Sequence, residues 1–267
     1  MTLKEAALEF WLFGVKEAQA CVFAGSFFFL LFLSKHLPLF GFARYDFLFL
    51  AAVLMQILLI ATKIESLDEA KAILLYHVIG LALEIFKTNP AIGSWSYPEA
   101  GFFKLMNVPL YSGFMYAAIG SYMMQSYRIF HMRLERLPDM RLSIALCAAA
   151  YLNFFTHHWI PDFRFLLIAL VLVLFARTKA FFTVKTAERM MPIPVSFLLI
   201  AFFIWIAENI STYFGAWQYP DQVHAWTLVA SGKITSWFLL VIISFIIMVD
   251  LKVVKAGRTI AKQAEAR

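Results

Sequence analysis

Charged residues are scarce in this chain of 267 residues: Asp, Glu, Lys and Arg make up 15% of it, while 62% is hydrophobic. Soluble domains carry about 25% charged and roughly 45–50% apolar residues. The chain therefore has too little polar surface for a water-soluble globule.

Cysteine is also nearly absent. Cys21 and Cys147 are each expected in the first helix of one half of the chain, toward the cytoplasm, where no disulfide is implied.

Familiar catalytic signatures are missing as well. The sequence has no P-loop, no GxGxxG, no nucleophile elbow and no zincin motif. No apolar stretch precedes Cys21, which excludes a lipoprotein cysteine. The net charge of +6 is better explained by membrane topology than by nucleic acid, and no nucleic-acid partner is expected.

Long apolar segments make up most of the chain, and they lack the alternation of barrel strands. In hydrocarbon a spanning segment must satisfy its own backbone, which leaves helices. We predict an all-α fold, a polytopic membrane bundle of about eight transmembrane helices forming one integral membrane domain over residues 1–267. The first 17 residues are expected to form an interfacial amphipathic helix. The predicted spans are residues 18–33, 45–62, 70–86, 108–127, 142–156, 163–176, 193–210 and 230–249.

Lys and Arg are distributed unevenly between the loops on the two sides of these spans. One side, which includes both termini, carries 17 of them and the other carries 6. Because positive residues stay cytoplasmic, both termini are predicted inside the cell, in a bacterial inner membrane. Loops 128–141 and 177–189 are then internal and are expected to be solvated connectors. The tail, residues 250–267, is expected to be a short helix or frayed end against anionic lipid.

A short pattern occurs twice: a carboxylate ends an apolar stretch, and Gly-x-Trp-x-Tyr-Pro-acid follows after a short gap. Trp95 and Trp217 are 122 residues apart, and Glu84 and Glu208 are 124 apart. This period predicts two parallel repeats of four helices each, over about residues 18–127 and 142–249. Such folds can place a site between their halves, and both Trp loops fall on the external side.

Glu84 and Glu208 are the strongest candidates for catalysis. Each is predicted near the external end of a helix, where a positioned carboxyl group can act as a general acid. The alternative is structural: each Glu accepts hydrogen bonds from the following Trp and Tyr and fixes the loop. His77 lies seven residues before Glu84, roughly 10 Å along the same helix face, and is a candidate proton partner. Gly80 between them would let another group approach closely.

His157 and His158 precede the second external turn. Adjacent histidines on a helix diverge by about 100°, so one is expected to face the bundle and the other the loop. His158 is a second candidate proton partner, and His157 a candidate ligand contact. With Asp162 they resemble an incomplete metal set. Metal ligation needs three or four converging donors, which could come from Glu84, Glu208, His77 and one of these two histidines, so a metal is left open.

The repeated aromatic residues allow two interpretations. Trp and Tyr are common at membrane interfaces. The fixed spacing with Gly and Pro instead predicts ordered loops whose aromatic rings line a pocket for an apolar or cationic ligand. These residues are Trp95, Tyr97, Trp217 and Tyr219.

With these motifs the chain resembles an uncharacterised bacterial integral membrane family, the YoaT-like family of unknown function, over most of its length. That resemblance implies a membrane protein and no activity. The resemblance is carried by His77-x-x-Gly80-x-x-x-Glu84-x-Phe86-Lys87, Gly93-Ser94-Trp95-Ser96-Tyr97-Pro98-Glu99, Gly113-Phe114-Met115-Tyr116, Asn153-Phe154-Phe155-Thr156-His157-His158 and Trp205-Ile206-Ala207-Glu208-Asn209.

A looser likeness concerns about 30 residues per half. Glu84, the Gly-x-Trp-x-Tyr element and Val108-Pro109-Leu110 are similar in order to motifs of membrane carotenoid hydratases and small lycopene cyclases. That likeness implies an intramembrane Glu that adds a proton to a polyene double bond.

Three functions follow as hypotheses. The first is a membrane enzyme acting on a lipid or isoprenoid in the outer half of the bilayer, with Glu84 or Glu208 as acid and His77 or His158 as its partner. The second is a transporter of a small solute or proton, and the third is a membrane scaffold. The cytoplasmic halves of the helices are expected to hold almost no ionisable residues, which disfavours proton translocation. Membrane lipid and an apolar or isoprenoid ligand are the expected partners, and the cofactor is left open.

Overall fold

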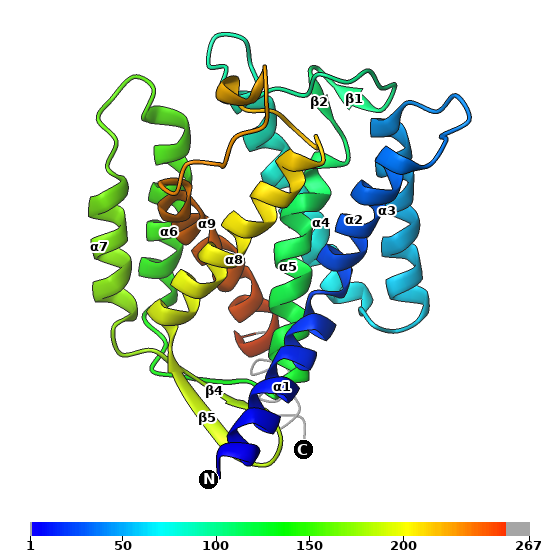
Figure 1. Cartoon of the computed structure of the whole chain (residues 1–267). Helices are drawn as coiled ribbons and strands as arrows, with labels where there is room; N and C mark the ends of the chain where they lie inside the picture. The colour runs from blue at the N-terminus through cyan, green and yellow to red at the C-terminus, as the bar shows by residue number, and fades with distance from the viewer. Residues whose placement is uncertain (1, 255–267) are drawn as a thin grey trace, which may run out of the picture.

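The computed structural model describes residues 2–254, and helices make up 65% of these residues (Figure 1). The expected tail lies outside the described residues from residue 255 onward. The helices are α1 (Leu3–Ala20), α2 (Val22–His36), α3 (Arg44–Ala61), α4 (Leu67–Lys87), α5 (Ser112–Ile129), α6 (Met140–Thr156), α7 (Arg164–Phe175), α8 (Ile193–Tyr213) and α9 (Lys233–Val249), followed by a π-helical turn (Asp250–Val254). The strands are β1 (Lys104–Leu105), β2 (Val108–Pro109), β3 (Arg133–Glu135), β4 (Lys179–Thr183) and β5 (Glu188–Pro192).

Each of the eight predicted ranges contains one helix, but some boundaries differ. The chain bends by 70° between α1 and α2, so the first predicted span begins at Val22 rather than at residue 18. The fourth begins at Ser112, because Val108 and Pro109 pair with β1 in a short antiparallel ladder. Apolar composition alone does not distinguish these entry turns from the helices that follow them.

The helices are arranged as two outer pairs around a central group (Figure 1). α2 packs on α3 and α6 on α7, while α4 packs on α5 and α8 on α9 between them. α2 also contacts α5, as α6 contacts α9, and α5 contacts α9 at the centre. The helices of the two halves thus make corresponding contacts.

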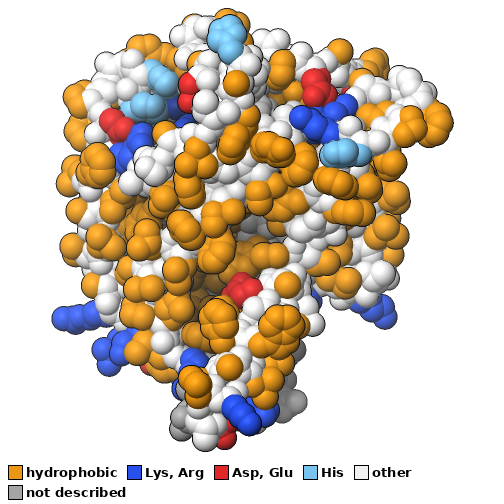
Figure 2. All heavy atoms as spheres, in the orientation of Figure 1, with side chains coloured by type: hydrophobic (Ala, Val, Ile, Leu, Met, Phe, Trp, Pro, Cys, Tyr) orange, Lys and Arg blue, Asp and Glu red, His pale blue; other side chains and the backbone are white. Residues whose placement is uncertain are grey.

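Three helices are long and apolar enough to cross a membrane, within the described residues: Arg44–Ala61, Ile193–Tyr213 and Lys233–Lys252. The bent pair α1 and α2 brings the number to four if it counts as one span. α4 is not among them, because each 18-residue stretch of it contains more than two charged residues, from the set Asp68, Glu69, Lys71, Glu84 and Lys87. Figure 2 shows hydrophobic side chains covering most of the middle of one face, with the Lys and Arg side chains toward its two ends and the histidines near one of them.

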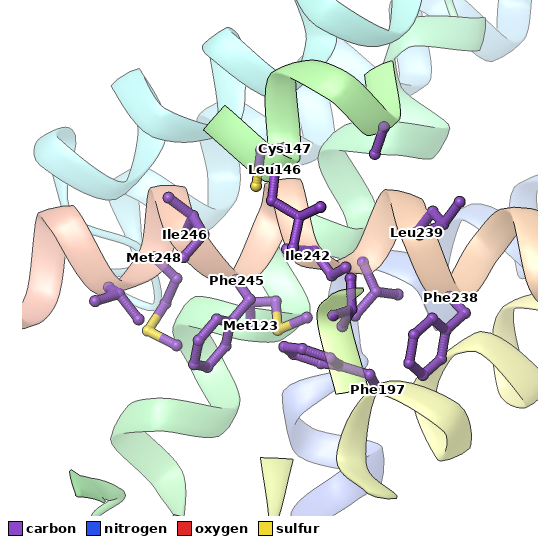
Figure 3. Close-up of a cluster of buried hydrophobic side chains, with 14 of the residues drawn as sticks. Met123, Leu146, Cys147, Phe197, Phe238, Leu239, Ile242, Phe245, Ile246 and Met248 are labelled. Atoms are coloured by element: carbon purple, nitrogen blue, oxygen red, sulfur yellow. The ribbon is translucent and has the colours of Figure 1, made fainter. Parts of the chain in front are cut away.

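The largest cluster of buried hydrophobic side chains is centred on α9 (Figure 3). Phe238, Ile242 and Phe245 of α9 pack against Phe197 of α8, and Leu146 of α6 joins the same cluster. α9 therefore contacts neighbours on several sides, which fits a helix that is apolar around its whole circumference.

The prediction that loops 128–141 and 177–189 are only solvated connectors was wrong, and the fold is not purely helical. β3, β4 and β5 form a three-stranded antiparallel sheet at the end of the bundle where the N-terminus lies (Figure 1). Ala180 of the central strand β4 is buried, and Glu9 of α1 forms an ion pair with Arg189 of β5 at 2.5 Å. Strands of three to five residues give too short a pattern to be separated from a basic loop by composition.

Two buried carboxylates lie at this same end of the bundle, Glu65 between α3 and α4 and Glu69 in the first turn of α4. Glu65 and Glu69 are each 1% exposed there. Glu69 pairs with Lys252 and Arg128, whereas Glu65 accepts hydrogen bonds from the Gln56 amide at 2.5 Å and from the Ser121 hydroxyl. These carboxylates lie in or beside the turn between α3 and α4, which folds inward rather than into solvent.

Glycines explain the close packing of α4 on α5, and they give a first prediction. A Cβ at Gly80 would lie 2.4 Å from the ring of Tyr116 and 2.7 Å from its Cβ. We expect Gly80→Ala to lower the free energy of unfolding by about 1–3 kcal/mol through overpacking. Gly25→Ala is the matched control in α2, where nothing lies within 4 Å, and it should be neutral or stabilising by up to about 1 kcal/mol. Unfolding in mixed micelles measures both, and equal effects would refute the close contact.

Candidate functional site

Glu84 lies in the last turn of α4 and is 3% exposed. Its Oε2 accepts hydrogen bonds from Trp95 Nε1 and Tyr97 OH, each at 2.7 Å, and its Oε1 accepts one from Tyr116 OH at 2.8 Å. The loop returns over the helix end through Gly93, whose φ of +59° favours glycine. The structural alternative foreseen from the sequence thus holds at Glu84: the following Trp and Tyr both bind it.

Glu208 of α8 is 4% exposed and makes a related but different set of contacts. Tyr219 OH donates to its Oε1, and Trp237 Nε1 of α9 donates to its Oε2 at 2.9 Å. The motif residue Trp217 is buried, but no hydrogen bond joins it to Glu208 among the described residues. The second copy therefore uses only one of its two motif aromatics on the carboxylate.

Tyr116 and Trp237 were missed by the sequence reasoning. Each follows its Glu by about 30 residues and occupies the helix after the Trp loop. A signal was present: the two residues are 121 apart, close to the repeat period, and Tyr116 lies in one of the quoted motifs.

The two Trp-Tyr loops pair with each other. Ser96 and Gln218, which follow Trp95 and Trp217 directly, form an isolated antiparallel bridge with two N–H to O=C bonds of 2.9 Å. The rings of Trp95 and Tyr219 meet edge to face, with centroids 6.1 Å apart. The loops therefore close together over one end of the bundle, opposite the β3–β5 sheet (Figure 1).

A cavity of about 340 Å³ lies beneath these loops. Glu84 and Glu208 both reach it, and so do Trp95, Trp217 and Tyr219 of the motifs. Its other polar walls are Lys87, His157, Arg164, Lys233 and Ser236, and its apolar walls include Leu83, Met115, Phe154 and Leu240. The structure thus gathers carboxylates, cations and aromatic rings from α4, α5, α8, α9 and the turn after α6 around one space.

Lys87 and Lys233 reach the cavity from opposite halves. The Lys233 ammonium lies 4.4 Å from the ring centroid of Tyr219 and 5.3 Å from that of Trp95, a cation–π arrangement. Lys87 is 5% exposed, and its Nζ donates to His158 Nε2 at 2.8 Å, with His157 Nε2 at 3.4 Å. Arg164 forms an ion pair with Asp162 at 2.9 Å.

The two histidines contact the same ammonium, so the prediction that they point in different directions was wrong. His157 caps the C-terminus of α6, and the chain leaves the helix there. Their rings lie 4.1 Å apart. Because His157 Nδ1 lies 2.8 Å from the Asn153 carbonyl, that nitrogen carries the proton, and Nε2 is left as an acceptor.

This arrangement gives a second prediction, which concerns pH. Partial burial and then the charges of Lys87 and His157 lower the pKa of His158 below its ordinary 6.5. The unfolded chain therefore binds more protons than the folded one as pH falls through about 6.5, and stability falls with it. We expect His158→Gln to flatten this loss between pH 7.5 and pH 5.5. Unfolding midpoints against pH test it, with the exposed His36→Gln as control, and a slope unchanged in His158→Gln would contradict it.

His77 lies on α4 with Glu84, as its position in the sequence predicts, but it is not among the residues that line the cavity. Its ring packs edge-on against Phe114, with centroids 4.7 Å apart, close over Gly113 of α5. Its Nδ1 is buried with no hydrogen-bond partner among the described residues, and no hydrogen bond joins it to Glu84. Within residues 2–254, no group of three or more His, Cys, Asp or Glu side chains converges to hold a metal ion.

Comparisons with known proteins identify a family for this chain but give no activity. A family described as "Protein of unknown function (DUF817)" matches residues 9–245. The chain is 49% identical over 243 residues to the "Uncharacterized protein YoaT" of Bacillus subtilis (strain 168), covering 91% of each chain. No solved structure matches. The looser likeness to carotenoid hydratases is not shown by these comparisons.

Proposed function

Because this chain belongs to the DUF817 family of proteins of unknown function, we propose its function from the cavity rather than from a relative. The proposal is an integral membrane enzyme of the bacterial inner membrane that acts on a lipid or isoprenoid at the outer half of the bilayer. The observation that carries it is the meeting of Glu84 and Glu208 in one cavity under the paired Trp loops.

The membrane arrangement is part of this proposal. It has eight spans in two parallel halves, with both termini in the cytoplasm. The uneven distribution of Lys and Arg and the corresponding contacts of α2 with α5 and of α6 with α9 support it. The bridge between Ser96 and Gln218 supports it further, since the residues that pair hold the same place in the two motifs.

The chemistry proposed is proton transfer within the bound ligand. Both carboxyl groups have only neutral hydrogen-bond donors, and the positive charge of Lys233 acts more strongly on Glu208 than on Glu84. Glu84 then serves as the acid and Glu208 as the base. One carboxyl gives a proton to one carbon of a double bond while the other removes a proton from a carbon next to that double bond. The double bond moves, no atom is gained or lost, and no co-reactant is required.

The remaining predicted residues take supporting roles. Trp95, Tyr219 and Trp217 line the cavity and present ring faces or edges to positive charge that develops on the ligand. Tyr97 and Tyr116 hold Glu84 in place. His158 and His157 orient the Lys87 ammonium rather than either carboxylate.

Untargeted lipid mass spectrometry on the purified protein tests this function. A lipid or isoprenoid should co-purify with the wild type and change in identity or amount in Glu84→Gln and Glu208→Gln. Asp221→Asn is the matched control, because Asp221 is the exposed acid of the second motif and does not line the cavity. Bulk phospholipid alone, unchanged in either variant, would overturn the enzyme proposal.

Transport is the second candidate, and one observation favours it. Glu65, Glu69 and Ser121 place buried polar groups in the opposite half of the bundle, where a solute path would have to continue. Proton or solute flux into liposomes containing the protein, measured with Glu65→Gln as the test variant, separates this candidate from the enzyme. If the mass spectrometry finds no specific lipid and the liposomes show no flux, a membrane scaffold is the remaining hypothesis.

A further inference from the structure

Two cations of the cavity, Lys87 and Lys233, form no ion pair with a carboxylate among residues 2–254, whereas the third, Arg164, pairs with Asp162. Lys87 is almost fully buried, yet its hydrogen-bond acceptors are imidazole nitrogens of His157 and His158 rather than carboxylate oxygens. Lys233 contacts the faces of two aromatic rings. Among residues 2–254, no ion pair joins either ammonium to a carboxylate, although Glu84 and Glu208 line the same space.

The two carboxyl groups of the cavity, those of Glu84 and Glu208, are held by other partners and do not pair with these lysines. Both oxygens of Glu84 and both of Glu208 accept hydrogen bonds from Trp and Tyr side chains, which hold them on the loop side of the cavity. The positive charges of Lys233 and Arg164 act unfavourably on the Lys87 ammonium, and the Asp162 carboxylate offsets them in part. Carboxylates act favourably on Lys233, though none is its ion-pair partner: Glu208, Glu84 and Asp221. A buried charge with neutral partners and like-charged neighbours is unfavourable unless an anion joins it.

We propose that this cavity binds the phosphate group of an amphiphile, with Lys87, Lys233 and Arg164 as the residues that hold it. The inference rests on the proposed function, because it names the substrate class of the same site. A phosphate monoester carries a charge of about −1.5 to −2 at pH 7, which suits three cations better than a single carboxylate does. Arg164 supplies a fork of donors matched to phosphate oxygens, and the lysines supply point charges.

The apolar walls indicate what the phosphate is attached to. Leu83, Met115, Phe154 and Leu240 line the same cavity as the cations. Its volume of about 340 Å³ is at the lower end of the range of about 300–1,000 Å³ for small-molecule sites. The cavity thus has room for a phosphate and the first carbons of a chain, while the rest of the chain extends beyond it.

Thermal unfolding of the full chain in an uncharged maltoside detergent tests the proposal with three probes. Farnesyl phosphate carries both the anion and the chain, farnesol carries the chain alone, and inorganic phosphate carries the anion alone. We expect a saturable rise of the unfolding temperature with farnesyl phosphate and none with farnesol. A further rise with inorganic phosphate alone would support the same site and identify the free anion as sufficient for binding.

Matched variants assign the effect to the cavity. Lys87→Met and Lys233→Met should each weaken farnesyl phosphate binding at least tenfold, while Lys87→Arg retains most of it because the charge is kept. Lys35→Met is the control, since Lys35 is an exposed lysine at the same end of the bundle and does not line the cavity. Equal shifts with farnesol and farnesyl phosphate, or Lys87→Met binding as well as Lys35→Met, would overturn the inference.

The two proposals fail separately. Farnesyl phosphate binding involves no turnover, so it persists if Glu84 and Glu208 have no catalytic role. Conversely, suppose that a co-purified lipid changes in Glu84→Gln but carries no phosphate. That result would support the enzyme proposal and contradict the proposal that the cavity binds a phosphate group.

Discussion

Replacing Glu84 with leucine is expected to lower the free energy of unfolding by about 3–5 kcal/mol, the largest effect of any single change in the cavity. The substitution keeps the size of the side chain but leaves Trp95 Nε1, Tyr97 OH and Tyr116 OH without their acceptor. Each buried donor left unsatisfied costs about 1–3 kcal/mol, reduced where water can reach it. Glu84→Gln keeps one carbonyl oxygen as an acceptor, and its cost should be about 1–2 kcal/mol.

The second motif supplies the comparison. Glu208→Leu frees two donors, Tyr219 OH and Trp237 Nε1, so it should cost about 1–2 kcal/mol less than Glu84→Leu. Unfolding by a denaturing detergent in mixed micelles measures the three variants under one condition. A Glu84→Leu protein within about 1 kcal/mol of the wild type would show that the carboxylate does not hold the loop.

Replacing Arg44 with methionine is expected to cost about 2–4 kcal/mol, because this guanidinium joins the two halves at the loop end. The Arg44 side chain is 9% exposed and forms an ion pair with Glu99 at 2.7 Å. It also donates to the carbonyl oxygens of Phe214 and Gly215, at the end of α8, and to Ser34 Oγ. Arg44→Lys should recover only part of the loss, because an ammonium cannot reproduce the fork of donors.

Arg133→Met is the control for Arg44. Arg133 also forms ion pairs, with Glu135 and Glu188, but all three side chains are about half exposed. Exposed ion pairs are screened by solvent and contribute little to stability, so this variant should be close to the wild type in the same unfolding assay. Equal losses in Arg44→Met and Arg133→Met would contradict the role of Arg44 as a buried link between the halves.

Much of this site was within reach of the sequence. The spacing of 124 residues between Glu84 and Glu208 and the repeated Trp-x-Tyr element predicted a shared site, and both carboxylates line one cavity. Helices fall within all eight predicted apolar ranges because a helix needs only local composition. Three or four helices are long and apolar enough to cross a membrane. That all eight do so stays a prediction.

What the sequence did not predict depends on contacts between distant segments. Lys87 was read as part of a motif, and only the return of the turn after α6 brings His157 and His158 onto it. Tyr116 reaches Glu84 from another helix, at a distance that Gly80 permits. The sheet β3–β4–β5 joins loops separated by about 45 residues, and such pairing leaves no periodic signal in short basic segments.

An experimental structure of the protein in nanodiscs of its own membrane lipids would test the central claim most directly. We predict a non-protein molecule in the cavity, with its anionic head between Lys87, Lys233 and Arg164 and its chain leading toward Leu240. The Ser96–Gln218 bridge should close the loops over it. A cavity filled by protein side chains, or cations turned away from it toward solvent, would contradict the account.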